Sequence, residues 1–268
     1  MERRHIAIFP ILIALAVMGF RYCSAEKITS PLTGKTARVG LSSQQEETLG
    51  LQSYHEVLSQ SDVINSGPEH DLVVRVAERL ARAAGDAARD FQWEVSLVRS
   101  DQVNAFCLPG GKIVVYTGIL PYTQTEGALA AVMGHEMSHA VARHGSQRLL
   151  RSSLAQTFLI GANFSMGNLD SQQRQTIMAA LGAGAQYGVL LPFSREHETE
   201  ADELGLIFMA RAGYDPHEAI SFWERMSTVG GAQPQAYLST HPSHARRIED
   251  LQAFMPKAMA EYEKAKAR

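Results

Sequence analysis

The stretch AAVMGHEMSHAVARHG, residues 130–145, carries His135 and His139 four positions apart, with Glu136 directly after the first histidine. On an α-helix, residues four apart project from the same face, so both imidazoles can direct a ring nitrogen at one point. A zinc ion takes nitrogen ligands at about 2.0–2.1 Å and prefers four ligands in a tetrahedron. The motif therefore predicts a helix that supplies two ligands, and it requires a fold that brings further ligands from elsewhere.

Glu136 projects about a quarter-turn away from His135 on such a helix. This direction is unsuited to metal ligation, but it brings the carboxylate within reach of a water on the metal, as a general base requires. The alternative is a half-buried helix whose histidines satisfy hydrogen bonds, because a motif this short also occurs by chance. A ligand from another segment decides between these interpretations.

Residues 194–206, SREHETEADELGL, are helical in pattern and unusually acidic. Glu198 and Asp202 are four apart and share a face, whereas Glu196 and Glu200 lie two positions off that row. Such a run is usually a solvated face, but this one adjoins apolar residues: Ala201, Leu204, Leu206, Ile207 and Phe208. A carboxylate that enters an apolar helix interface needs a cation or hydrogen-bond donors, and a zinc ion would be that partner.

The N-terminus has the layout of a secretory signal peptide. Arg3 and Arg4 precede an apolar run from Ile6 to Phe20, and the small residues around Ala25 suit signal peptidase. We therefore expect a signal peptide over residues 1–25 and a periplasmic protein. The apolar run is short for a bilayer span, and bulky residues precede the lipoprotein candidate Cys23, so a membrane-anchored or lipidated form is the less favoured alternative.

Composition narrows the class of protein. The chain has 268 residues, 45% of them hydrophobic, which is enough for a full core. Its net charge of −3 becomes more negative once residues 1–25 are removed, so no basic surface indicates a nucleic-acid partner. Of the two cysteines only Cys107 would remain in the mature chain, which predicts a fold without an intramolecular disulfide.

The remaining pattern predicts an α+β fold. Residues 26–42 are turn-rich and are interpreted as a surface arm, and residues 43–268 as one domain. Two helical segments come first, followed by a small sheet of three or four strands that includes a hairpin at Gly110-Gly111. After Thr123 the pattern is helical almost to the end. Residues 161–190 form either a mobile cover over a groove or, as we favour, a tightly packed helix pair.

Two motifs together resemble a known family. GHEMSH (134–139) followed by ETEAD (198–202) is similar to the exported, HtpX-like zinc metallopeptidases of the gluzincin clan, whose relatives include the CAAX-prenyl protease and periplasmic proteases. Further likeness extends over about residues 43–250. The resemblance implies a mainly helical zincin-like domain with one zinc ion per chain. It also implies that Glu198 is the third ligand beside His135 and His139, and that Asp202 orients His135.

The same resemblance suggests roles outside these motifs. STHPSHARRI (239–248) is similar to the family's C-terminal signature, which would place Arg247 near the zinc as a donor to the oxyanion. His241 would either aid that charge or occupy the open zinc position and hold the enzyme latent. NAFCLPGGKIVVYTGIL (104–120) is similar to the family's edge strand, so Asn104, Ala105 and Phe106 would bind an extended peptide. Phe106 is equally well explained as a core residue.

The function implied is zinc-dependent endopeptidase activity on unfolded or misassembled envelope proteins, in protein quality control. The alternative is a chaperone-like envelope assembly factor with a latent, His241-plugged zinc site. A zinc hydrolase acting on cell-wall peptides also fits the expected compartment. Polypeptides are the expected partners, with outer-membrane assembly proteins as further candidates, and the sequence carries no signal for the oligomeric state.

Overall fold

The computed structural model describes residues 7–30, 32–185, 194–228, 237, 239, 241 and 246–267. The chain forms two compact units. Unit 1 comprises Met1–Thr29, Thr36–Ser42 and Gly145–Leu191. Unit 2 comprises Ser30–Lys35, Ser43–His144 and Pro192–Arg268.

The sheet of unit 2 contains β3 (Val63–Ile64), β4 (Glu94–Val98), β5 (Ala105–Leu108) and β6 (Lys112–Tyr116) in the order β3-β4-β6-β5. β4 and β6 run parallel, the other pairs are antiparallel, and β5 lies at an edge. The glycines that join β5 to β6 both have positive φ, 79° and 92°, a conformation that glycine adopts at low cost. The predicted hairpin is confirmed, whereas β3 is too short to show an alternating pattern in the sequence.

Each face of this sheet is covered by helices. Val98 and Val114 pack with Tyr54 of α2 (Ser43–Ser59), and the alternate residues of the same strands contribute to the main core on the other face. That main core includes α3 (Pro68–Ala84), which packs against β4. The strands alternate in this way because successive side chains point to opposite faces of a sheet.

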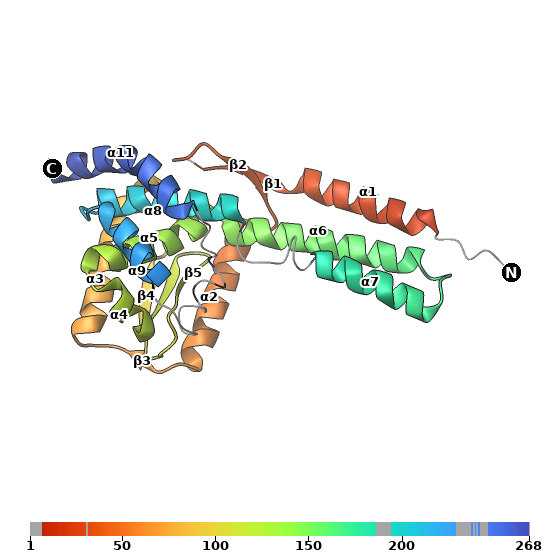
Figure 1. Ribbon diagram of the computed structural model, residues 1–268, viewed down its shortest axis with the longest axis horizontal. Coiled ribbons are helices and arrows are strands. Elements are labelled where there is room, and N and C mark those ends of the chain that lie inside the picture. Colours follow the sequence, from red (N-terminus) through yellow and green to blue (C-terminus); the bar gives the residue numbers. More distant parts are fainter. Residues whose placement is uncertain are drawn as a thin grey trace. The chain divides into compact units, whose positions relative to one another are not determined.

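Among the described residues of unit 2, the other longer helices are α5 (Glu126–Val141), α8 (Arg195–Arg211), α9 (His217–Thr228) and α11 (Arg247–Lys266). α5 packs against α3, α8, α9 and the edge strand β5, and α8 also packs against α11 (Figure 1). Short helical turns connect these elements: η1 (Gly85–Ala88), η2 (Thr117–Ile119) and α4 (Leu120–Thr123). The expected α+β fold, mainly helical with a small sheet before the histidine helix, is confirmed.

Two glycines set the distance between α5 and α8. A Cβ placed on Gly205 would lie 3.0 Å from the backbone nitrogen of His135, and one on Gly134 would lie 3.2 Å from the carbonyl oxygen of Gly205. These contacts are tighter than ordinary van der Waals packing, so the backbones approach this closely because neither position carries a side chain. The approach brings the histidines of α5 opposite the acids of α8.

Unit 1 contains α1 (Ile8–Ser24), a hairpin of β1 (Glu26–Thr29) and β2 (Thr36–Val39), and the helices α6 (His144–Ser165) and α7 (Ser171–Ala185), except for His144 at the start of α6, which belongs to unit 2. The sequence pattern predicts no strand in the proposed surface arm, because segments of four residues between turns are too short for a clear period. Residues 161–185 are helical apart from the α6–α7 connection, and 186–190 lie outside the described residues. The predicted domain boundaries stay predictions.

Unit 1 also carries most of the large apolar side chains that are exposed in the described residues. They are Ile8, Phe9, Leu12, Ile13, Leu15, Val17, Phe20, Tyr22, Leu149, Ile160, Phe164 and Ile177. Among the residues that the structure describes, none of the helices has both the length and the apolar character needed to cross a membrane.

Candidate active site

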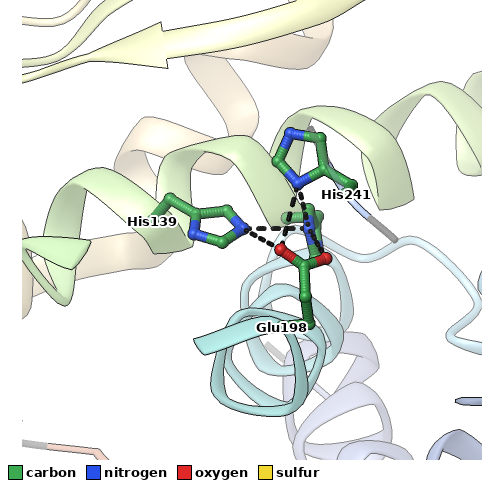
Figure 2. A group of neighbouring side chains, drawn as sticks. His139, Glu198 and His241 are labelled. Atoms are coloured by element: carbon green, nitrogen blue, oxygen red, sulfur yellow. Dashed lines mark hydrogen bonds and ion pairs between the residues drawn. The ribbon is translucent and has the colours of Figure 1, made fainter. Parts of the chain in front are cut away.

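Four buried side chains converge between α5 and α8. His135 and His139 come from α5, Glu198 comes from α8, and His241 lies in the segment before α11. One ligating atom from each side chain lies within 4.8 Å of all the others. Figure 2 shows His139, Glu198 and His241 directed at a common centre.

The distances between these atoms match a tetrahedral zinc site. Two of them lie 3.1 Å apart, the Nε2 atoms of His135 and His139. The Glu198 carboxylate oxygens lie 3.4 and 3.5 Å from these two nitrogens. His241 Nδ1 is 3.3 Å from His135 Nε2 and 3.3 Å from Glu198 Oε1. Ligands about 2.0–2.1 Å from a tetrahedral metal are separated by roughly 3.3 Å, so this donor set fits zinc.

Asp202 holds His135 from the side remote from this centre. Its Oδ1 lies 2.8 Å from His135 Nδ1, the contact that the sequence analysis expected. Arg247 donates to the same Asp202 oxygen at 2.7 Å and to Glu198 Oε2 at 3.1 Å. A carboxylate on the second ring nitrogen fixes the tautomer in which Nε2 is free to ligate.

Arg247 is 1% exposed, and its guanidinium carbon lies 3.5 Å from the centre of the Trp223 ring. It lies beside the cluster, where its two Nη atoms contact Glu198 and Asp202. Both of its Nη atoms donate to carboxylates, which is the arrangement of a residue that holds ligands in place. Its suggested role as an oxyanion donor stays a prediction.

His139 has a different support. Its Nδ1 lies 2.9 Å from Nδ1 of His144, whose Nε2 is 3.4 Å from Glu200 Oε2. The helical spacing does not predict this contact, because Glu200 lies off the Glu198–Asp202 row and the helical pattern after Thr123 shows no break before His144. In the structure α5 ends at Val141, and Arg143 adopts a left-handed φ of 56° that redirects the backbone.

Glu136 contacts His241 on the edge of the ring that faces away from His135 and Glu198. Its Oε1 accepts a hydrogen bond of 3.0 Å from the Tyr237 hydroxyl and lies 3.4 Å from His241 Nε2. The Tyr237 ring stacks on His241 with centroids 4.8 Å apart. His241 therefore bridges the cluster and Glu136 through its two ring nitrogens. No sequence motif pointed to Tyr237.

Burial and charge separate the two glutamates electrostatically. Burial raises the pKa of Glu136. Burial also acts to raise the pKa of Glu198, but hydrogen bonds from His135 and His241 outweigh it and hold that pKa well below its usual value. Two neighbouring carboxyls with pKa values pushed in opposite directions suit different tasks: the ionised one ligates, and the other exchanges a proton.

The imidazoles of α5 are separated in the same way. Burial lowers the pKa of His135, yet the hydrogen bond and charge of Asp202 outweigh it and raise that pKa to about 9. The pKa of His139 is held well below its usual value, first by burial and then by the neighbouring imidazoles. His139 is therefore neutral, which is the form that binds a metal, whereas His135 has to release a proton when it binds one.

Comparison with known proteins agrees with this geometry. The family model of peptidase family M48 matches residues 69–255. The chain belongs to peptidase family M48. It is a zinc metalloendopeptidase, as the metal-binding cluster and the names of its family relatives indicate.

Similar proteins occur in yeasts and in bacteria. Mitochondrial metalloendopeptidase OMA1 of Schizosaccharomyces pombe is 34% identical over 87% of this chain and 68% of its own length. The protein of the same name in Saccharomyces cerevisiae is 30% identical over 92% and 73%. The Beta-barrel assembly-enhancing protease of Escherichia coli is 29% identical over 83% of this chain and 46% of its own length. The expected family is thus confirmed, whereas the exported, HtpX-like grouping is supported only in part.

The edge strand predicted for substrate lies beside the M48 site helix, since β5 packs against α5. Ala105 is buried in the core that α5 shares. Phe106 points to the opposite face of the sheet, where its ring meets the Tyr116 ring edge-on with centroids 6.0 Å apart. This contact is consistent with the alternative that Phe106 is a core residue. Asn104 turns its side-chain oxygen back to the backbone nitrogen of Ala105 at 3.0 Å. Substrate binding by these three residues stays a prediction.

Proposed function

We propose that His135, His139 and Glu198 hold the zinc ion and that Glu136 is the general base for hydrolysis of peptide bonds. The observation that carries this proposal is the set of 3.1–3.5 Å separations among the donor atoms of these three ligands. When bound, zinc supplies Lewis acidity, which lowers the pKa of a water to about 7 and polarises the substrate carbonyl.

The side chains of this chain divide the remaining work. Glu136 takes a proton from the attacking water and delivers it to the leaving amine, and its raised pKa suits both transfers. Asp202 keeps His135 in the ligating tautomer. An extended substrate would add to the free edge of β5 along Asn104–Phe106 by backbone hydrogen bonds, which select little for sequence.

Replacing Glu136 tests the enzymatic proposal. We expect Glu136→Gln to lower casein cleavage by at least about 10²-fold, because it removes the proton acceptor, while the bound zinc measured by metal analysis stays at the wild-type amount. Glu196→Gln makes the same chemical change at an exposed position of α8 and should cleave casein normally. Equal activity of Glu136→Gln and Glu196→Gln would end this proposal.

A second candidate is an assembly factor whose zinc site is latent. The observation that favours it is the position of His241, whose Nδ1 lies within 3.3 Å of both His135 Nε2 and Glu198 Oε1. If zinc is bound, the imidazole in that position would act as the fourth ligand and would exclude water from the metal. Hydrolysis then requires His241 to move away.

His241→Ala distinguishes an open site from a latent one. We expect higher casein cleavage than in the wild type if the imidazole blocks the site, because its removal frees one corner. His55→Ala, at an exposed position of α2, is the matched control. Unchanged or lower activity in His241→Ala would remove the latent-site candidate, and only lower activity would support the role of His241 as an aid to the reaction.

We further propose unfolded or misassembled envelope proteins as substrates and the periplasm as the compartment. The signal-peptide pattern of residues 1–25 supports the compartment. The name of the Escherichia coli relative, a Beta-barrel assembly-enhancing protease, supports envelope substrates and outer-membrane assembly partners. Digestion of purified peptidoglycan beside casein tests the cell-wall alternative, since cleavage of peptidoglycan alone would replace this substrate class.

A further inference from the structure

We propose that His144, Glu200 and Thr33 form a hydrogen-bonded chain that positions His139 for zinc binding. The inference rests on the proposed zinc site, in which His139 ligates through Nε2. All three are positioning residues, since they act on the metal only through His139. None of them belongs to the two motifs that define the ligands.

The first contact decides where the protons lie. His139 Nδ1 and His144 Nδ1 are 2.9 Å apart, so one proton is shared between them and only one of the two nitrogens donates. A neutral His139 that ligates through Nε2 carries its proton on Nδ1. His139 is therefore the donor, and His144 Nδ1 is the acceptor.

The remaining contacts follow from that assignment. With Nδ1 accepting, the proton of neutral His144 lies on Nε2, which faces Glu200 Oε2 at 3.4 Å. The other oxygen, Glu200 Oε1, accepts from the Thr33 hydroxyl at 2.6 Å. The hydrogen bonds therefore all donate toward Glu200: His139 donates to His144, His144 donates to one Glu200 oxygen, and the Thr33 hydroxyl donates to the other.

This arrangement gives the two helical ligands equivalent supports. His135 donates directly to Asp202, whereas His139 reaches its carboxylate through an intervening imidazole. A carboxylate that accepts a hydrogen bond from the non-ligating ring nitrogen raises the basicity of the ligating nitrogen and fixes the orientation of the ring. Without the chain, His139 would have to change tautomer or lose a buried hydrogen bond when the metal binds.

Burial gives the chain its rigidity. His144 is fully buried, Glu200 is 6% exposed, and the His197 ring stacks on His144 with centroids 4.3 Å apart. Polar networks in such surroundings are strong when every member is satisfied. The left-handed Arg143, an uncommon conformation for a residue other than glycine, turns the backbone so that His144 can face back toward His139.

Thr33 extends the site beyond the predicted domain. It lies in Ser30–Lys35, a segment that belongs to unit 2 although it precedes Ser43 in the chain. A threonine in the proposed surface arm thus orients the carboxylate that supports a zinc ligand. Its hydroxyl offers a conservative test, because Thr33→Ser keeps the donor and Thr33→Val removes it.

The experiment measures the zinc affinity of the full chain by competition with a chromogenic chelator at one fixed pH. We expect Glu200→Leu to weaken zinc binding by about 10–100-fold, because His144 loses the carboxylate that accepts its hydrogen bond. Thr33→Val should weaken it less, and Thr33→Ser should restore the wild-type value. Glu196→Leu, on the exposed side of the same helix, is the matched control.

A spectroscopic measurement separates positioning from folding. With Co²⁺ in place of zinc, the visible absorption of Glu200→Leu should shift, because His139 is held less firmly, while that of Glu196→Leu should match the wild type. If Glu200→Leu fails to fold, the Thr33→Val and Thr33→Ser pair gives the same comparison. If folded Glu200→Leu and Thr33→Val bind zinc with wild-type affinity, the positioning role of the hydrogen-bonded residues is wrong and the proposed zinc site still stands. A wild-type protein that binds no zinc would overturn both.

Discussion

At the scale of single residues, the site depends on a permanently charged side chain that is almost fully buried. Arg247 donates to Glu198 at 3.1 Å and to Asp202 at 2.7 Å, and all three side chains are at most 9% exposed. Removing one member of a buried charged set costs more than a surface pair contributes, because the remaining charges stay unpaired in a low-dielectric interior. Arg247 therefore stabilises the metal-free site.

The buried charges around Arg247 determine the expected effect of Arg247→Met. We expect the variant to lose about 3–5 kcal/mol of unfolding free energy without metal, measured by urea denaturation in a chelator. Arg211→Met removes a partly exposed pair with Glu261 and should cost less than about 1 kcal/mol. Similar losses in the two variants would contradict the structural role of Arg247.

At the scale of elements, the crossing of α5 and α8 determines whether the ligands meet. Gly134 and Gly205 let the two backbones approach, and the ligands project from the helices on either side of that contact. A side chain at the crossing forces the helices apart or bends them. Because a zinc site tolerates only small changes in ligand position, the packing defect and the metal defect should occur together.

Gly205→Ala tests this coupling. We expect a loss of about 1–3 kcal/mol in unfolding free energy, the usual cost of overpacking, together with weaker zinc binding in the chelator assay. Gly145→Ala is the matched control, since nothing lies within 4 Å of a Cβ placed there and its φ is not positive. Unchanged zinc affinity in Gly205→Ala would show that α5 and α8 can adjust without moving the ligands.

The helices that carry the ligands were predictable because their patterns are local. The i, i+4 spacing of His135 and His139, and of Glu198 and Asp202, follows from helix geometry alone. Contacts that depend on a break in the helix could not be predicted from the sequence. His144 faces His139 only because Arg143 leaves the helical conformation, and Tyr237 reaches Glu136 from a segment 101 positions away. No local periodicity reports either event.

At the scale of the whole molecule, the chain leaves unit 2 after His144 and returns to it at Pro192. The sequence pattern predicts one domain over residues 43–268, because helical periodicity continues across this junction and carries no information about which helices pack together. Inside unit 2, the site joins α5, α8 and the segment that carries His241. Folding of unit 2 and metal binding are therefore linked.

Zinc removal tests that link. A ligand that binds only the folded state adds about 2.7 kcal/mol at a hundredfold excess over its dissociation constant. One kcal/mol corresponds to about 2–4 °C in a domain of 150–250 residues. We therefore expect the chelated protein to unfold several degrees lower than the zinc-loaded protein. Fluorescence is a suitable measurement, because both tryptophans, Trp93 and Trp223, belong to unit 2.

His139→Ala is the control for this measurement, because it removes one ligand and should make the unfolding temperature insensitive to added zinc. The comparison is informative because the cluster is buried: Glu198 is 0% exposed and, without a cation, depends on His135, His241 and Arg247 to stay charged. A bound cation relieves that cost only when the imidazoles and the carboxylate converge. Equal zinc-dependent shifts in the wild type and His139→Ala would place the metal elsewhere, because a site that survives the loss of its ligand is not this one.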